Sequence, residues 1–276
     1  MRTFILAAGL LLALPAAFPV VSAAEGAAGT SDAALAAAVS NPARTSAFVE
    51  RDVARKPQQV LKFAGINPKM TVVEISPAAG YWTEILAPYL GKQGTYYTAI
   101  APRASSERAA KAADTWAEKL GANKAAWGEV RISEFGKGAA GIAPAGSADL
   151  VLTFRNVHNW MAAGFIDEVF PAFFAALKPG GTLVVEEHRG ATDKPQDPKA
   201  ASGYVREDFT RELAQKAGFE FVGSSEILAN PKDTKDWERG VWTLPPTLAL
   251  GDKDREKYLA IGEADNYLLK FRKPGK

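Results

Sequence analysis

Short apolar runs alternate along the chain with longer segments that have the periodicity of amphipathic helices. The runs Thr71–Ile75, Thr95–Ile100 and Asp149–Phe154 lack regular polar alternation, as is typical of strands buried on both faces of a parallel sheet. Helical segments follow the first two runs, at Tyr81–Leu90 and Ser106–Leu120. This order predicts an α/β protein with a mostly parallel, doubly wound sheet.

The second half of the chain continues this alternation and then changes. A helix is predicted over Ala162–Leu177, and Lys178-Pro179-Gly180-Gly181 is expected to stop it and to reverse the chain before a strand at Thr182–Glu186. The other expected elements are strands at Val130–Ile132, Phe219–Ser225 and Tyr267–Arg272 and a helix at Arg206–Ala217. The stretch Asn230–Leu250 has no clear periodicity, which is typical of lids and binding loops.

The chain begins with the three parts of a secretory signal peptide. Arg2 is followed by an apolar run over Phe4–Leu14 and by small residues up to Ala24. A transmembrane anchor is the alternative interpretation, but two prolines interrupt the apolar part, and its uncharged length barely reaches that of a bilayer span. We therefore expect residues 1–24 to be cleaved, with no stable membrane insertion afterwards.

Two further segments precede the first strand. Residues 25–44 are rich in Ala, Gly and Ser, with a short helical stretch at Ala33–Val39, and we expect a flexible, loosely held arm. Thr45–Ile66 is predicted to form two helices that are divided at Pro57. Because no internal repeat is visible, residues 45–276 are expected to form a single domain.

Composition narrows the possible partners. Without Arg2, the chain has 32 Lys and Arg against 31 Asp and Glu. A nearly neutral chain without a basic cluster argues against nucleic acid and anionic membrane surfaces as partners. The chain has no cysteine, which excludes disulfides, thiolate metal sites and cysteine nucleophiles. The oligomeric state is left open.

The most informative chemistry follows the first predicted strand. In an open parallel sheet, ligands bind beyond the carboxyl ends of the strands. Here Glu74 lies at the strand end, and the small residues of Ser76–Tyr81 lead into a helix. Such a turn lets backbone amides approach a ligand closely.

This segment, VVEISPAAGYWTEILAPYL, resembles motif I of the class I S-adenosylmethionine (SAM) dependent methyltransferases. The resemblance implies that the turn surrounds the carboxypropyl and ribose groups of SAM. Two departures are visible: Ser76 and Ala78 stand where that superfamily commonly has glycine, and Ala99–Pro102 offers no acid for the ribose hydroxyls. The expected cofactor-binding residues are Glu74, Ser76, Pro77, Ala78, Gly80, Tyr81 and Asn156.

Further segments are similar to a family of exported bacterial methyltransferases. They are RNVHNW, LKPGGTLVVEEHRG, GYVRE, AGFEFVGSSEILANPKDTKDW, GVWTLPPTL and YLAIGEADNYLLKFRKP, so that the similarity runs from Arg51 to Pro274. It implies a Rossmann-like class I methyltransferase fold with an antiparallel C-terminal strand. It also implies SAM as cofactor and a periplasmic location, while the methyl acceptor, expected to be a small or medium molecule, is not identified by the resemblance.

Each residue of the turn also allows a purely structural role without ligand contact. Glu74 either binds the ammonium group of the ligand or only orders the turn through its amides, and a carboxylate at a buried strand end requires some partner. Tyr81 and Trp82 begin the next helix. Aromatic residues at such a position contact a ligand about as often as they belong to the core.

The only two histidines, His158 and His188, both follow predicted strands. A neutral imidazole at this edge could take a proton from an acceptor hydroxyl or amine, so both are candidate catalytic residues. The alternative is a pair of hydrogen-bonded structural histidines. Two imidazoles without a tight spacing motif are poor evidence for a metal, and none is predicted.

Polar and aromatic residues near the histidines are candidates for holding the acceptor. Arginines in this cluster could fork onto a carboxylate or phosphate of the substrate, or the cluster is a salt-bridged rim. The predicted substrate-binding residues are Arg155, Trp160, Arg189 and Tyr204. The stretches Ala191–Ser202 and Asn230–Pro246, the latter with Trp237 and Trp242, either close over the site as a lid or cover the sheet edge.

These observations favour a periplasmic methyltransferase, with export as the main objection, because SAM is made in the cytosol. The alternative is a non-catalytic periplasmic protein that binds another small molecule on the same fold. The substituted glycines and the missing ribose acid favour that alternative. A hydrolase that uses the histidine pair lacks a convincing nucleophile.

Overall fold

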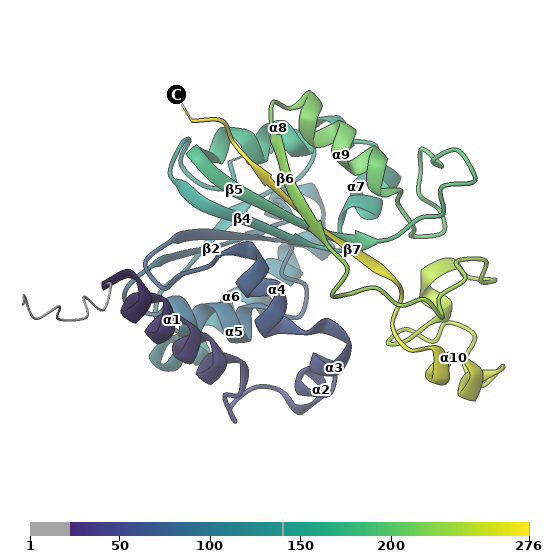
Figure 1. Cartoon of the computed structure of the whole chain (residues 1–276), viewed down its shortest axis with the longest axis horizontal. Helices are drawn as coiled ribbons and strands as arrows, with labels where there is room; N and C mark the ends of the chain where they lie inside the picture. Colours follow the sequence, from purple (N-terminus) through teal and green to yellow (C-terminus); the bar gives the residue numbers. More distant parts are fainter. Residues whose placement is uncertain (1–22, 140, 276) are drawn as a thin grey trace, which may run out of the picture.

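The computed structural model describes residues 23–139 and 141–275. Its seven strands form one sheet in the order β3-β2-β1-β4-β5-β7-β6, with helices on both faces (Figure 1). The strands are β1 Thr71–Ile75, β2 Thr95–Ile100, β3 Val130–Glu134, β4 Ala148–Phe154, β5 Leu177–His188, β6 Glu220–Ser225 and β7 Asn266–Arg272. β7 runs antiparallel to β5 and β6, and the other pairs are parallel. The predicted doubly wound α/β sheet with an antiparallel C-terminal strand is confirmed.

Ten α-helices and two short 3₁₀ turns surround the described part of the sheet. The helices are α1 Ala23–Val39, α2 Ser46–Val49, α3 Asp52–Arg55, α4 Pro57–Ala64, α5 Thr83–Leu90, α6 Glu107–Trp127, α7 Val157–Ala163, α8 Ile166–Ala176, α9 Glu207–Lys216 and α10 Arg255–Ile261. The 3₁₀ turns are η1 Arg103–Ser105 and η2 Gly240–Thr243. The chain before β1 forms three helices where two were predicted: α4 begins at Pro57 as expected, but the segment before Pro57 is divided into α2 and α3.

Two expectations about the middle of the chain were wrong. The predicted helix over Ala162–Leu177 is two helices, because Gly164 adopts a φ of 75° and ends α7 before α8 begins. The expected reversal at Lys178–Gly181 is instead an irregular start of β5: Ala148 pairs with Leu177, and the regular register resumes at Leu150 and Thr182. Helix α7 matters most, since it carries His158.

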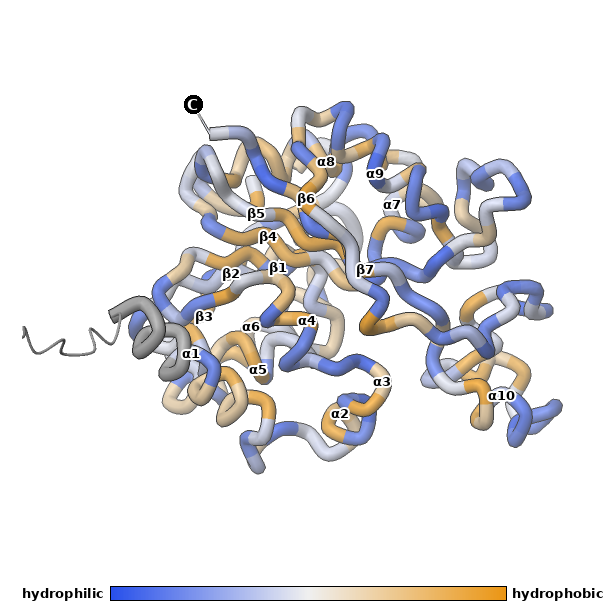
Figure 2. Tube along the Cα trace, in the orientation of Figure 1, coloured by the Kyte–Doolittle hydropathy of each residue, from blue (hydrophilic) through white to orange (hydrophobic). Residues whose placement is uncertain are grey.

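Each face of the sheet has its own apolar core. Helices α1, α4, α5 and α6 cover one face, where residues such as Leu61, Ile85 and Leu152 are fully buried. Helices α7, α8 and α9 cover the other face around Phe170 and Phe173. In Figure 2 the central strands are mainly orange and the peripheral loops mainly blue. Burial on both faces explains why the strands are apolar without polar alternation.

The segment expected to be a loosely held arm is packed in the structure. Leu35 and Ala38 of α1 are buried in the same core as α4 and α5, and Ser31 Oγ lies 2.8 Å from the hydroxyl of Tyr89. The predicted signal peptide falls almost entirely on residues 1–22, outside the described residues. None of the helices that the structure describes has the length and hydropathy to cross a membrane.

A small third cluster lies at the carboxyl end of the sheet. It joins η2, α10 and the residue Tyr204 through buried side chains. The backbone of Gly240 passes so close to Ser202 that an added Cβ would lie 2.1 Å from the Ser202 carbonyl oxygen. The next residue, Val241, donates its N–H to that oxygen at 2.9 Å. The segment around η2 is therefore fastened over the strand ends.

Candidate functional site

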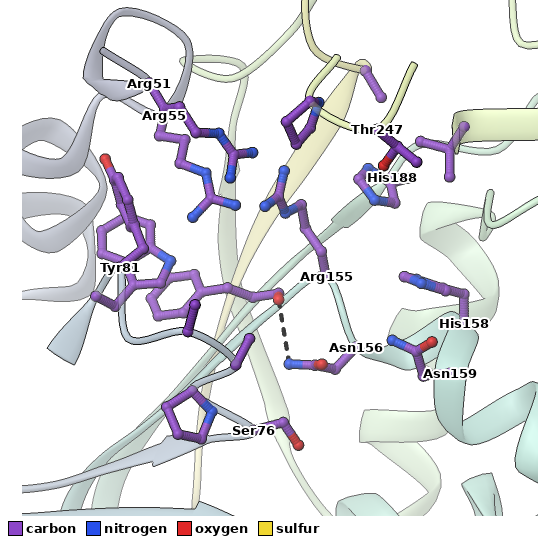
Figure 3. A pocket seen from close by; sticks show the side chains of 18 of the residues that line it. Arg51, Arg55, Ser76, Tyr81, Arg155, Asn156, His158, Asn159, His188 and Thr247 are labelled. Atoms are coloured by element: carbon purple, nitrogen blue, oxygen red, sulfur yellow. Dashed lines mark hydrogen bonds between the residues drawn. The ribbon is translucent and has the colours of Figure 1, made fainter. Parts of the chain in front are cut away.

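A cavity of about 330 Å³ opens at the carboxyl ends of β1 and β4. Figure 3 shows it from close by. Its walls are the turn after β1, helix α3, the ends of β4 and β5 with the start of α7, and the segment around η2. Ligands of open α/β sheets bind at this edge, and the cavity is therefore the candidate site.

The turn Ser76–Tyr81 has the backbone of a glycine-rich loop although it contains a single glycine. Ser76, Ala78 and Gly80 have φ values of 53°, 52° and 94°. The left-handed region costs a residue with a side chain roughly 1–2 kcal/mol, and such strain concentrates at functional sites. At Gly80 an added Cβ would also lie 3.1 Å from the Trp116 ring. The departures from glycine thus leave the shape of the turn intact.

Part of the hydrogen-bonding capacity of this turn is unused. The N–H groups of Ser76 and Gly80 donate to main-chain carbonyls at 2.8 and 2.9 Å. Those of Ala78 and Ala79 have no acceptor within the described part of the chain, and both residues are exposed. The turn therefore presents two adjacent amides that a ligand can use.

Glu74 is bound to hydroxyl groups below this turn rather than to its amides. Its Oε2 accepts hydrogen bonds from Thr83 Oγ1 at 2.7 Å and from the hydroxyl of Tyr96. Burial raises the pKa of Glu74 to about 7, although both hydrogen bonds act to lower it. The carboxyl group is therefore close to half-ionised at neutral pH, and it lines the cavity.

Three arginines converge on the cavity next to Tyr81 (Figure 3). Arg51 donates to both carboxylate oxygens of Glu263 at 2.7 Å, and Arg155 donates to the same carboxylate at 2.9 Å. The side chain of Arg55 makes no hydrogen bond within the described residues, and its Nε is buried without a partner. Its guanidinium lies 4.3 Å from the centre of the Tyr81 ring. The carboxylate of Glu263 is thus hydrogen-bonded to two of the guanidinium groups and lies 3.9 Å from the third.

A second carboxyl group stands close to this cluster. Glu186 is fully buried, its Oε1 lies 3.8 Å from Arg155 Nε, and its Oε2 has no hydrogen-bond partner. Burial raises the pKa of Glu186 to about 7, against the opposing effect of Arg155. The carboxyl group therefore neutralises Arg155 only partly at neutral pH.

The two histidines stand side by side, with ring centroids 5.4 Å apart. His158 Nδ1 lies 2.9 Å from Glu187 Oε1, and His188 Nδ1 lies 2.7 Å from Asn266 Oδ1. The pKa of Glu187 is lowered, because its interactions with His158 and His188 outweigh the effect of burial. Burial lowers the pKa of His188 to about 3. His188 is therefore a neutral hydrogen-bonding residue, whereas His158 is paired with an ionised carboxylate.

These residues also have a geometry that could hold a metal. His158, Glu187 and His188 each place one ligand atom within 4.8 Å of the others, and all three are buried. In the structure Glu187 is already bound to the ring of His158 and to the backbone N–H of His188. The prediction that no metal is bound stays a prediction.

A second, wider hollow of about 900 Å³ lies on the other side of the turn. The residues 76–79 line both cavities, and Ile100 and Ala101 at the end of β2 line the second one. Glu107 in the first turn of α6 also faces this hollow. A carboxylate is therefore present beside the end of β2, although the strand itself ends without an acid.

The structure brings most of the predicted site residues together. The cavity is lined by Glu74, Ser76, Pro77, Ala78, Tyr81, Arg155, Asn156, His158 and His188. Asn156 uses its amide to bond the ends of strands, donating to the carbonyls of Ile75 and Phe154 at 3.2 Å. Gly80 belongs to the turn but packs next to the Trp116 ring and does not line the cavity.

Three predicted substrate-binding residues do not line the cavity. Trp160 is part of the apolar core, and Tyr204 is buried with its hydroxyl bound to Asp233. Arg189 forms ion pairs with Glu207 and with two other acids on the outer side of the sheet end. Sequence alone could not separate Arg189 from Arg155, because both directly follow strands. It also could not show that Trp160 and Tyr204 pack into apolar clusters and not into the cavity wall.

Other lining residues were not singled out from the sequence. Arg51 and Arg55 are four residues apart on one helical segment, which is a signal that both side chains share a face. Of the two stretches expected to form a lid, only the second contributes: Trp242 lines the cavity, 6.0 Å from the His158 ring. Trp237 instead packs against Tyr258.

No family model and no curated protein matches the chain, but many solved structures do. A SAM-dependent methyltransferase from Aquifex aeolicus is 16% identical, with 81% of this chain and 93% of that chain covered and a TM-score of 0.53. The cyclase SpnF is 15% identical over 86% of each chain, with a TM-score of 0.54. Phosphoethanolamine N-methyltransferase 2 of Haemonchus contortus, solved with S-adenosyl-L-methionine, is 16% identical over 80% of this chain and 52% of its own, with a TM-score of 0.50. At such identities the likeness establishes the class I methyltransferase fold, and the cyclase illustrates that the fold alone does not define a reaction.

Proposed function

We propose that this protein is a SAM-dependent methyltransferase that acts on a small or medium acceptor. The observation that carries the proposal is the buried His158–Glu187 pair, whose imidazole lines the same cavity as the strained turn Ser76–Tyr81. A proton acceptor and a set of free amides thus meet at the ligand-binding edge of a methyltransferase fold.

The residues of the turn fit the cofactor in three respects. The N–H groups of Ala78 and Ala79 are free to donate hydrogen bonds to an anionic or polar group, and Glu74 offers a carboxyl group whose ionisation an ammonium group would favour. The adjoining hollow beside β2 supplies apolar surface and Glu107 for an adenosyl group. SAM, when bound, supplies a methyl group on a positively charged sulfur.

The role of the chain in transfer is to orient the acceptor and to remove its proton. Glu187 accepts a hydrogen bond from Nδ1–H of His158 and so fixes the tautomer in which Nε2 carries the lone pair. The acceptor oxygen or nitrogen would bond to the methyl carbon as the carbon–sulfur bond breaks and S-adenosylhomocysteine leaves. The proton of the acceptor would pass to Nε2 of His158, and Glu187 would stabilise the imidazolium. A positioned base of this kind contributes roughly 10²–10⁴-fold to a rate.

A binding protein on the same fold would have little use for this arrangement. Burying an ionised carboxylate beside one imidazole costs free energy of folding, and such a cost is expected where the pair has a chemical role. His188, neutral and tied to Asn266, closes the cavity wall beside it. We therefore infer transfer rather than storage of a ligand.

We also propose that the mature protein works in the periplasm of a bacterium. The support is the signal-peptide pattern of residues 1–24. Cell fractionation of the full-length chain, with an intact cytosolic marker as control, tests this location. Recovery of the uncleaved chain in the cytosol would contradict it.

Calorimetric titration of the protein without residues 1–24 tests the function. S-adenosylhomocysteine (SAH) is the suitable probe, because it keeps the cofactor framework and cannot react. We expect saturable one-site binding that weakens when Ala78 is replaced by a bulkier residue, as in Ala78→Val, because a β-branched side chain opposes a φ of 52°. Absence of heat, under conditions in which a known methyltransferase binds SAH, would contradict the proposal.

A further inference from the structure

The charges around Arg55 are not balanced by the chain itself. Arg51, Arg55 and Arg155 carry three positive charges, and the acids in reach are Glu263 and Glu186. The cluster therefore keeps at least one net positive charge in a largely buried place. An excess of this kind attracts anions into a cleft.

Arg55 is the clearest sign of a missing partner. Its side chain is 8% exposed, and the nearest carboxylate oxygen, Glu263 Oε2, is 3.9 Å away and already bonded to Arg51 and Arg155. A guanidinium has five N–H donors, and burying it without hydrogen bonds is unfavourable. Figure 3 shows the guanidinium groups of the three arginines pointing toward one another at the cavity.

SAM does not remove this excess. Its sulfonium and ammonium groups carry two positive charges against one carboxylate, and ionisation of Glu74 would offset the ammonium group, so that the excess at the arginines remains. A neutral acceptor would leave that charge uncompensated. A carboxylate or phosphate on the acceptor would compensate it and would match the planar, forked donors of arginine.

We propose that the methyl acceptor carries an anionic group, a carboxylate or a phosphate, and that Arg51, Arg55 and Arg155 bind this group. The statement that the anion belongs to a methyl acceptor rests on the proposed function. The anion-binding site itself does not. The arginines hold one end of the substrate, while His158 on the other wall of the cavity faces the end that is methylated. Of the arginines, the sequence had indicated only Arg155.

Calorimetric titration with inorganic phosphate at constant ionic strength tests the site, with and without saturating SAH. We expect the unmodified protein to bind phosphate in both cases. Arg55→Met should weaken phosphate binding about 10- to 100-fold, as expected for the loss of charge-assisted hydrogen bonds, and should leave the SAH affinity nearly unchanged. Arg51→Met, on a more exposed side chain, should act in the same direction if Arg55→Met does not fold. The control is Arg255→Met, which removes an exposed arginine that lines neither cavity.

Two results would overturn the proposal. The first is phosphate binding that is absent from the unmodified protein or unaffected by both arginine variants. The second is competition between SAH and phosphate together with a loss of SAH affinity in Arg55→Met, which would assign the arginines to the carboxylate of the cofactor. If SAH fails to bind but phosphate binds through Arg55, the proposed methyl transfer fails while the anion site stands.

Discussion

The pKa of Glu74 leads to a prediction about stability that involves no ligand. In the folded protein burial raises this pKa from 4.5 to about 7, so the native state keeps a proton that the unfolded chain releases between these two values. Stability then falls as the pH rises through this range. A shift of about 2.5 pKa units corresponds to about 3 kcal/mol of unfolding free energy.

The comparison with Glu74→Gln isolates this effect. The amide has the shape of the protonated carboxyl group, and its oxygen can still accept hydrogen bonds from Thr83 and Tyr96. Contributions from groups that the substitution does not touch cancel in the difference between the two proteins. The unfolding free energy of the wild type minus that of the variant should therefore be largest below pH 4.5 and smaller by about 3 kcal/mol above pH 7.

Urea unfolding at a series of pH values from 4 to about 8.5 measures this difference. A difference that stays constant across the series, or that grows with rising pH, would show that Glu74 is already ionised in the folded protein at acidic pH. The proposal that an ammonium group of the ligand favours ionisation of Glu74 would then lose its basis.

Four further predictions concern the same edge of the sheet. Gly80→Ala should lower the unfolding free energy by more than Gly138→Ala, because both glycines have positive φ but only Gly80 would place its Cβ against Trp116; equal losses in thermal melts would contradict the crowding. His158→Asn keeps an N–H for Glu187 but no basic Nε2, so kcat on an acceptor found by screening for SAH release should fall roughly 10²–10⁴-fold with SAH affinity retained; a normal kcat would remove His158 as the base. The pKa of His188, lowered to about 3 in the folded state, means that the unfolding free energy of the wild type should fall more steeply than that of His188→Asn as the pH decreases from about 6.5 to about 3; parallel curves would refute the burial effect. Prolonged treatment with EDTA should leave methyl transfer unchanged, and a loss that Zn²⁺ or Mg²⁺ restores would instead assign His158, Glu187 and His188 to a metal.

Much of the fold was predictable because buried parallel strands leave a strong signal. β1 and β2 begin and end at the predicted residues, since their apolar runs are bounded by turns. Helix α7 was missed because Gly164 divides two helices within one helical pattern, and the difference is a backbone φ that composition does not reveal. The packing of α1 depends on contacts with α4 and α5, which are distant in the sequence.

The site was predictable where it follows strand ends and not where it depends on other elements. The turn after β1 and both histidines lie on one cavity, as their positions after strands indicated. Sequence position could not show that Arg189 turns outward to its acids while Arg155 turns inward. It also could not show that the N-cap residue of α3, Arg51, and its last residue, Arg55, line the cavity, although α3 precedes the sheet in the sequence.

The central claim is that the turn Ser76–Tyr81 binds the cofactor beside the His158–Glu187 pair, and a crystal structure with SAH tests it most directly. We predict that the ligand accepts hydrogen bonds from the amides of Ala78 and Ala79 and that its sulfur faces the cavity with His158. A ligand bound away from this turn, or a sulfur separated from His158 by packed side chains, would contradict the claim.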